Sequence, residues 1–281
     1  MKKARTILNR LAVFIAFSLL ISGCSMFGLD LQEDYDYKPS LLEENVNMTA
    51  WEYLKKRANG NNPNDTVFRW MKKAIDYSGI DTLEYTKPNR TYIFLHNEAI
   101  RRVNATQVLQ ANCFFIDFPM ITKNPDGSIV YTTPTSGIPV TSTPTKSWKD
   151  YDKETVKKYL LYLIGVGDYN YSNLTPDEVV VQSLLEPGNV ATKESRLGYM
   201  VTPSTKSGFT TGSTGTPAVF GFDYVGTTGK GFDPEGKFTL KLSNTADSKV
   251  FFNGGLIVRS SNYKATNGTI HVWGVTVRPS R

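Results

Sequence analysis

The sequence predicts an α+β fold, because helical and strand patterns follow one another along the chain without an internal repeat. Two early stretches, 49–57 and 66–78, place apolar residues at helical spacing. Short runs rich in β-branched and aromatic residues, separated by turn formers, dominate the last third. The 40% of apolar residues, with 15 Tyr and 15 Phe, suffices for a substantial core, so we expect a folded domain.

The first 24 residues carry the three parts of an export signal. Four basic residues precede the apolar run Leu11–Ile21, which is too short to cross a bilayer. Ile21-Ser22-Gly23-Cys24 then resembles the lipobox of bacterial lipoproteins, where the cysteine is acylated and the chain is cut just before it. We expect residues 1–23 to be a lipoprotein signal peptide and Cys24 the lipid attachment site. An ordinary signal peptide with an incidental cysteine is the alternative.

Removal of this signal lowers the formal charge. The whole chain carries +6, but residues 1–23 hold four bases and no acids, so 28 bases and 26 acids remain. No basic block interleaved with aromatic residues stands out in that remainder, and we expect no nucleic-acid partner. With Cys24 acylated, only Cys113 is left, which excludes an intrachain disulfide and a zinc site built from cysteines. Cys113 is expected to be buried.

Residues 24–46 are expected to form an acidic tether before a single domain at 47–281. Acidic residues are concentrated between Asp30 and Asp36, and Pro39 follows without a helical pattern. An acidic stretch after a lipid cysteine resembles the export signal with which Bacteroidetes-type bacteria place lipoproteins on the cell surface; a solvated spacer is the alternative. The expected location is the outer membrane, lipid-anchored and facing outward.

The domain begins with two predicted helices. Thr49 is a good N-cap for the helix over 49–57, and Asp65 or Thr66 can cap the second, which Gly79 ends. A strand is predicted at 92–95, followed at once by a helix start at 97–100.

The rest of the chain surrounds one further predicted helix, at 152–163. The β-rich runs 113–122 and 128–133 flank Asn124-Pro-Asp-Gly127, which predicts a hairpin. A Thr/Pro/Ser-rich loop is expected at 132–146. The remaining predicted strands are 179–185, 238–242, 250–252, 256–259 and 269–277, with a Gly/Thr-rich excursion at 207–231.

Three separated stretches resemble the fasciclin-type (FAS1) domain. The first stretch is Asp65–Leu83 followed by Arg90–Ile100, which resembles a helix of the family and the motif after it. The second, Lys158–Gly165, resembles the family's helix-to-strand segment, and the third, Lys264–Pro279, its C-terminal motif. The resemblance spans about 49–279 and implies a FAS1-like β-sandwich or wedge with flanking N-terminal helices and long insertions near 103–150 and 195–235. The structural motif residues that it implies are Asn97, Glu98, Tyr162, Asn267, Gly268, His271 and Pro279.

The third stretch also has a physical interpretation. Asn267-Gly268 is a turn dipeptide that favours positive φ and is expected to join two strands. His271, polar inside the second strand, needs a hydrogen-bond partner if it is buried. The resemblance implies a structural histidine bonded near the first stretch, not a catalyst. At Asn262-Tyr263 the chain lacks the acidic integrin-contact pair of animal members, so animal-style adhesion chemistry does not transfer.

The sequence shows no catalytic constellation. Only His96 and His271 could serve a Ser-His-Asp relay, and no serine lies in a Gly-x-Ser-x-Gly elbow. Gly226–Gly231 lacks the first glycine and the Ser/Thr of a phosphate-binding loop. We therefore expect no enzyme, no catalytic residues, no cofactor and no metal site.

Binding is better supported than catalysis. Trp148, which follows the Thr/Pro-rich loop, and the nearby Tyr169 and Tyr171 are the candidates for stacking on sugar rings. By contrast, Trp51 and Trp70 lie on amphipathic helices and are expected in the core or at its rim.

Two short segments resemble the O-glycosylation sequence of secreted Bacteroides-type proteins, in which Asp-Thr precedes an aliphatic residue. They are Asp65–Val67 and Asp81–Leu83. Ordinary cap or turn roles of Thr66 and Thr82 are the alternative.

Together these features predict a non-enzymatic, lipid-anchored cell-surface protein that binds or scaffolds a glycan, a matrix component or an outer-membrane protein. The resemblance implies that it accompanies a SusC/SusD-type uptake system. The alternative is a structural subunit of a surface appendage or envelope complex, with the two insertions as contact surfaces. A hydrolase is the weakest hypothesis.

Overall fold

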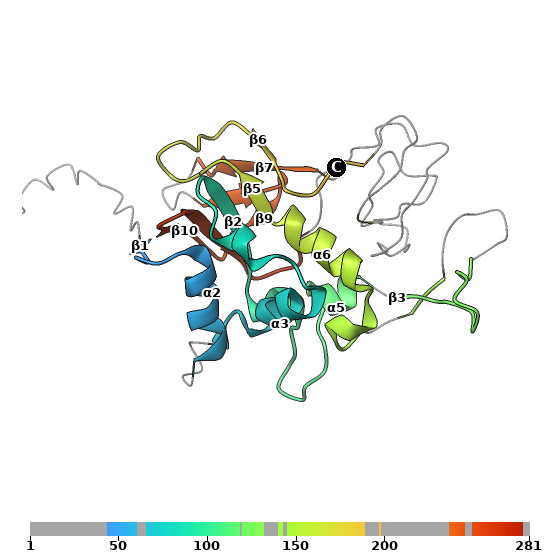
Figure 1. The fold of residues 1–281 in the computed structure, drawn as a ribbon. Coiled ribbons are helices and arrows are strands. Elements are labelled where there is room, and N and C mark those ends of the chain that lie inside the picture. Colours follow the sequence, from blue (N-terminus) through green and yellow to red (C-terminus); the bar gives the residue numbers. More distant parts are fainter. Residues whose placement is uncertain are drawn as a thin grey trace, which may run out of the picture. The chain divides into compact units, whose positions relative to one another are not determined.

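The computed structural model describes residues 44–60, 66–118, 120–131, 140–142, 145–188, 197, 236–244 and 249–277. These residues belong to one compact unit, 41–281. They form helices together with mixed sheets, which confirms the α+β prediction (Figure 1). The predicted signal peptide, Cys24, Pro279 and the 207–231 excursion lie outside the described residues.

The central sheet has five strands in the order β1-β10-β11-β2-β5. Its innermost pair is parallel, with Gly268 opposite Arg90 and Trp273 opposite Leu95. Every residue of β11 is buried, so the strand is covered on both faces and its apolar residues do not alternate with exposed ones. The bounds are β1 Glu44–Asn45, β2 Arg90–Leu95, β5 Ile164–Val166, β10 Ser260–Ala265 and β11 Gly268–Trp273.

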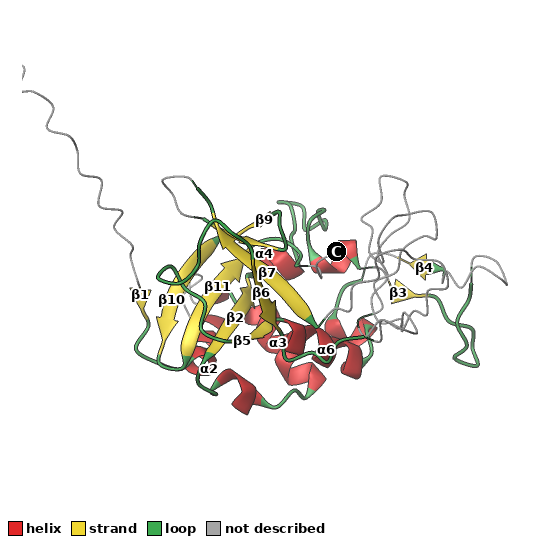
Figure 2. Cartoon of the chain, turned by 90° about the horizontal axis from the view of Figure 1, so that it is seen from above, coloured by secondary structure: helices red, strands yellow, loops and turns green. Residues whose placement is uncertain are grey.

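Three helices of ten residues each pack together on one side of this sheet (Figure 2). They are α2 (Ala50–Asn59), α3 (Arg69–Ser78) and α6 (Lys153–Tyr162). The predicted N-cap of α2 is confirmed, because Thr49 and Glu52 form a capping box, and so is the predicted end of α3 at Gly79, where φ is 67°. The predicted N-cap of α3 at Asp65 or Thr66 is wrong, because the helix begins at Arg69 after Phe68, whose side chain makes no cap hydrogen bond. These caps fix where the helices begin and end, and hence which of their side chains face the core.

A second, antiparallel sheet contains β6 (Val179–Gln182), β7 (Lys237–Leu242), β8 (Val250–Phe252) and β9 (Leu256–Ile257), in that order. A bridge between Gly165 and Ser183 joins it to β5. A Cβ on Gly165 would lie 2.6 Å from Val181 Cγ1 and 2.8 Å from Phe238 Cζ, so only glycine lets the strands approach this closely.

The prediction of a strand over 113–122 is wrong in its first half. Phe114–Asp117 forms the short helix α5, and only β3 (Met120–Ile121) is a strand, paired with β4 (Thr141–Ser142). Both Phe114 and Phe115 are buried against aromatic rings, and a helical turn lets these neighbours enter the core together where a strand would separate them. The hairpin at Asn124–Gly127 is confirmed, with Gly127 N–H donating to Asn124 O at 2.9 Å.

The domain begins slightly earlier than predicted. Glu44 and Asn45, placed in the tether by sequence, pair in parallel with Tyr263 and Lys264 of β10. The N–H of Val46 also donates to Lys264 O at 3.0 Å. The last residues of the predicted tether therefore form an edge strand of the central sheet.

Candidate functional site

Residues 167–175, which we name the tyrosine loop, leave β5 and carry Tyr169 and Tyr171. The loop starts at Gly167, whose φ of 109° suits glycine. Thr91 of β2 holds its first turn, because the Thr91 hydroxyl donates to Gly167 O at 2.7 Å and accepts from Tyr169 N–H at 2.8 Å. The entry to the loop is thus fixed to β2.

The imidazole ring of His271 forms the second attachment of the loop. The side chain is fully buried, and its Nε2 lies 2.9 Å from Tyr169 O, while Nδ1 lies 3.2 Å from the N–H of Asn262. The backbone N–H requires Nδ1 to accept, so Nε2 carries the proton and donates to the carbonyl. Both nitrogens are satisfied by a neutral ring. This confirms a buried histidine with partners, but the partners lie in the loop and in β10, not in the first FAS1-like stretch.

A bulge in β10 supplies the next attachment. Asn262 has φ 65° and lies where the β10–β11 register shifts between Ser260 and Tyr263. Its Oδ1 accepts from Tyr171 N–H at 2.9 Å, and the Tyr171 hydroxyl shares a hydrogen bond with Ser261 Oγ. The bulge therefore orients Tyr171 by both its backbone and its ring.

Asp168 completes the anchoring of the loop. Its carboxylate accepts from the Thr269 hydroxyl of β11 at 2.5 Å, and its carbonyl accepts from Asn173 Nδ2 at 2.7 Å. The outer part of the loop exposes Ser172 and Asn173, while the two tyrosines are half-buried. A rigid loop with aromatic rings beside hydroxyl and amide groups is suited to binding a polar ligand such as a sugar or a protein loop. Within the described ranges, no cluster of three or more His, Cys, Asp or Glu side chains could hold a metal ion.

Asn267 is a structural residue of the same sheet end. Its Oδ1 accepts from Ala50 N–H at 2.8 Å, and its Nδ2 lies 2.7 Å from Tyr92 Oη and 3.0 Å from Tyr85 O. The side chain thereby joins the start of α2 and the turn η2 (Thr82–Tyr85) to the central sheet. The predicted turn here is shifted: Ala265 pairs with Gly268, so Thr266-Asn267 is the turn, and Asn267 does not have positive φ.

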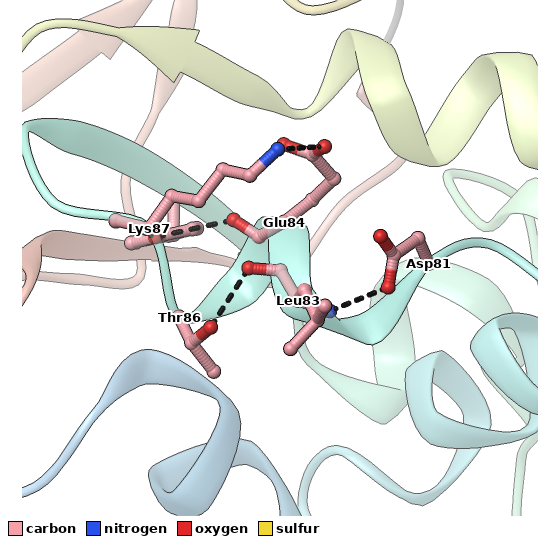
Figure 3. Close-up of polar contacts among 6 residues, drawn as sticks. Asp81, Leu83, Glu84, Thr86 and Lys87 are labelled. Carbon is pink, nitrogen blue, oxygen red and sulfur yellow. Dashed lines mark hydrogen bonds and ion pairs between the residues drawn. The ribbon is translucent and has the colours of Figure 1, made fainter.

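The turn η2, which precedes β2, is capped by Asp81. Asp81 Oδ1 accepts from Leu83 N–H at 2.9 Å and caps η2, and the Thr86 hydroxyl closes the turn on Leu83 O at 2.8 Å (Figure 3). Thr82 is thus the first residue of a turn that Asp81 caps, which agrees with the turn role given for Thr82 as the alternative to glycosylation. Glycosylation of Thr82, like that of Thr66, stays a prediction.

The other motif residues also have structural contacts. The side chain of Asn97, in α4 (Asn97–Ile100), accepts from Trp70 N–H at 3.0 Å and donates to Thr66 O at 2.6 Å. Glu98 pairs with Arg259 at 2.7 Å. Tyr162 is fully buried, and its hydroxyl lies 2.9 Å from Asn253 Nδ2. They stabilise the domain without meeting at one site.

Trp148 is not a surface residue, and its prediction as a stacking platform is wrong. It is 2% exposed, and its indole N–H donates to Trp70 O at 2.9 Å. Ser147 caps the turn η3 (Trp148–Asp150), which directs the ring onto Phe114, at a centroid distance of 4.9 Å. Cys113 is buried, as predicted.

Sequence reasoning missed Thr91, Asp168 and Asn262 as supports of the tyrosine loop. They come from three segments far apart in the chain, so no local spacing relates them. The only local signal was Asn262 itself, since asparagine tolerates positive φ better than most residues.

The chain has no match among family models or curated proteins. In the part of the chain that the structure describes, no helix combines the length and the apolar character needed to cross a membrane.

We expect stability to fall as the pH drops from 6.5 toward 4.5, because burial lowers the pKa of His271 to about 4. The unfolded chain binds a proton at its ordinary pKa near 6.5 while the folded chain does not, so this contribution is fully present above that pH. Complete titration costs about 3 kcal/mol. Urea midpoints at pH 7.5, 6.5, 5.5 and 4.5 measure the effect.

His271→Gln should flatten this dependence. His96→Gln is the matched control, because its pKa is also lowered by burial but its ring is half-buried. A pH dependence of stability that is retained in His271→Gln and lost in His96→Gln would contradict its assignment to His271.

Proposed function

We propose that the chain is a non-enzymatic, lipid-anchored cell-surface protein whose FAS1-like domain binds a glycan, a matrix component or a partner protein at the outer membrane. The fold assignment is supported by the sheet order. The three stretches that resemble the FAS1 family supply β2, β5 and β11, which are consecutive neighbours in the order β11-β2-β5. Three segments that are far apart in the sequence therefore lie side by side in one sheet.

The observation that carries the binding proposal is the anchoring of the tyrosine loop. Thr91, His271, Asn262 and Thr269 hold it by hydrogen bonds from three strands of the central sheet. A loop fixed in this way loses little conformational entropy when a ligand binds. Its polar tip and half-buried tyrosines make it the proposed contact with the glycan or partner.

The anchor is tested through Cys24. The full-length chain is produced in a diderm bacterium fed an alkyne fatty acid, and the membrane fraction is examined for label. We expect labelled, membrane-bound protein from the native sequence and unlabelled protein of higher mass from Cys24→Ser. Equal labelling of the two chains would rule out Cys24 as the attachment site.

The ligand is tested with Tyr171→Ala on a glycan array and in pull-downs from native membranes. Loss of the ring and of its bond to Ser261 is expected to weaken capture by about tenfold. Tyr131→Ala, at a tyrosine 40% exposed and outside the loop, is the matched control. A blank array together with blank pull-downs, with the wild type folded, would refute binding and favour the structural-subunit alternative.

A further inference from the structure

The helices α2 and α3 present a second surface that the tyrosine loop does not include. Together they carry six basic residues and two acidic ones. Both acids are already engaged: Glu52 accepts from Thr49 N–H at 2.8 Å, and Asp76 pairs with Lys72 at 2.6 Å. We name as the basic face Lys55, Lys56, Arg69, Lys72, Lys73 and the adjacent Arg101.

Four cations of this face are exposed, while Lys72 and Arg101 are half-buried. Arg69, Lys72 and Lys73 are at positions i, i+3 and i+4 of α3, opposite the buried Met71 and Ile75. Lys55 and Lys56 are exposed on the neighbouring α2. Among the described residues, Lys55, Lys56, Arg69 and Lys73 form no ion pair. The local excess of positive charge is therefore open to a partner.

Two tryptophans hold several of these cations in place. Lys55 Nζ and Lys72 Nζ each lie 5.5 Å from the ring centroid of Trp51. Lys73 Nζ lies 4.5 Å, and the Arg101 guanidinium 5.8 Å, from that of Trp70. Cation–π attraction orders side chains that are otherwise flexible, so less entropy is lost when they bind an anion.

The same rings restrict the kind of anion. Trp51 packs on Tyr85 and Trp70 on Phe115, with centroid distances of 6.0 and 5.4 Å, so neither ring can leave the protein to enter a bilayer. Cations near both rings compete with the base stacking that single-stranded nucleic acid requires. An acidic polymer whose negative groups project from non-aromatic rings needs neither insertion of the tryptophans into a bilayer nor free tryptophan faces for base stacking.

We propose that the basic face binds an acidic polysaccharide, whose carboxylates or sulfates pair with Lys55, Arg69 and Lys73 while its sugar rings lie along the edges of Trp51 and Trp70. This names a ligand class for a surface separate from the tyrosine loop, so it does not rest on that loop binding anything. The sequence shows no basic block interleaved with aromatic residues, because this surface forms only when two helices pack together.

The test measures binding of the full chain, in detergent, to heparin and to polygalacturonate by calorimetry. Arg69→Gln/Lys73→Gln is compared with Lys123→Gln/Lys249→Gln, which removes the same charge from exposed positions elsewhere. We expect the first variant to bind at least one of these polymers about tenfold more weakly and the control to change less than twofold. Thermal unfolding should be unchanged in both, since the substituted side chains are exposed.

Three outcomes with these probes and variants would overturn the proposal, and a fourth concerns Tyr171→Ala. The three are no binding to either acidic polymer, an equal loss in the two variants, and tighter binding to single-stranded DNA or phosphatidylglycerol vesicles than to both polymers. Native-strength polymer binding by Tyr171→Ala would show that this surface acts apart from the proposed function of the loop. Loss of polymer binding in Tyr171→Ala, with the basic-face variant unaffected, would place the polymer on the loop instead.

Discussion

Gly268→Ala is expected to lower the free energy of unfolding by about 4 kcal/mol. A Cβ at this position would lie 2.0 Å from Arg90 O, which belongs to the backbone of β2 and cannot rotate away. The backbone φ of 150° adds strain for any other residue. Urea unfolding followed by tryptophan fluorescence measures the loss, and an insoluble product agrees with it.

Gly255→Ala is the matched control for this substitution. Gly255 has no atom within 4 Å of a built Cβ and no positive φ, so its replacement should change stability by less than about 0.5 kcal/mol. A Gly268→Ala protein as stable as the wild type would mean that β2 and β11 are not packed as closely as described.

Asn267→Ala is expected to cost about 3 kcal/mol, because it leaves several buried polar groups without their partner. The lost amide joins Ala50 N–H, Tyr85 O and Tyr92 Oη. The effect should appear as a lower urea midpoint with unchanged far-ultraviolet circular dichroism of the remaining folded protein.

Asn59→Ala serves as the control, because Asn59 is exposed at the end of α2 and its replacement should be nearly neutral. A cost below about 1 kcal/mol for Asn267→Ala would show that water or a neighbouring side chain replaces the amide.

Local patterns were sufficient to predict several of the regular elements, but not β1 or β10, whose residues lie in none of the predicted strand ranges. The apolar spacing and caps of α2 and α3 are properties of ten-residue windows, and the structure places both helices within a few residues of the prediction. The Asn-Pro-Asp-Gly hairpin has the same local origin. By contrast, Phe114 and Phe115 resemble strand residues by composition, and only their contacts with Trp148 favour the helical turn.

The candidate site depends on contacts between residues that are far apart in the sequence, so no short stretch of sequence could predict it. Tyr169 and Tyr171 were recognised as aromatic residues in a polar loop, but their supports come from β2, β10 and β11. The Thr/Pro-rich run before Trp148 predicts an exposed side chain. In the structure Ser147 caps the turn η3, and Trp148 in that turn is buried. Tertiary contacts decided each of these positions.

The parallel pairing of β2 with β11 sets the order in which the domain can be assembled. Arg90 and Gly268 are partners although 178 positions separate them. A nascent chain cannot close this sheet until nearly all of it has left the ribosome, and non-local pairing of this kind slows folding. If the chain is exported as proposed, late closure of this sheet favours the transfer of an unfolded chain across the membrane.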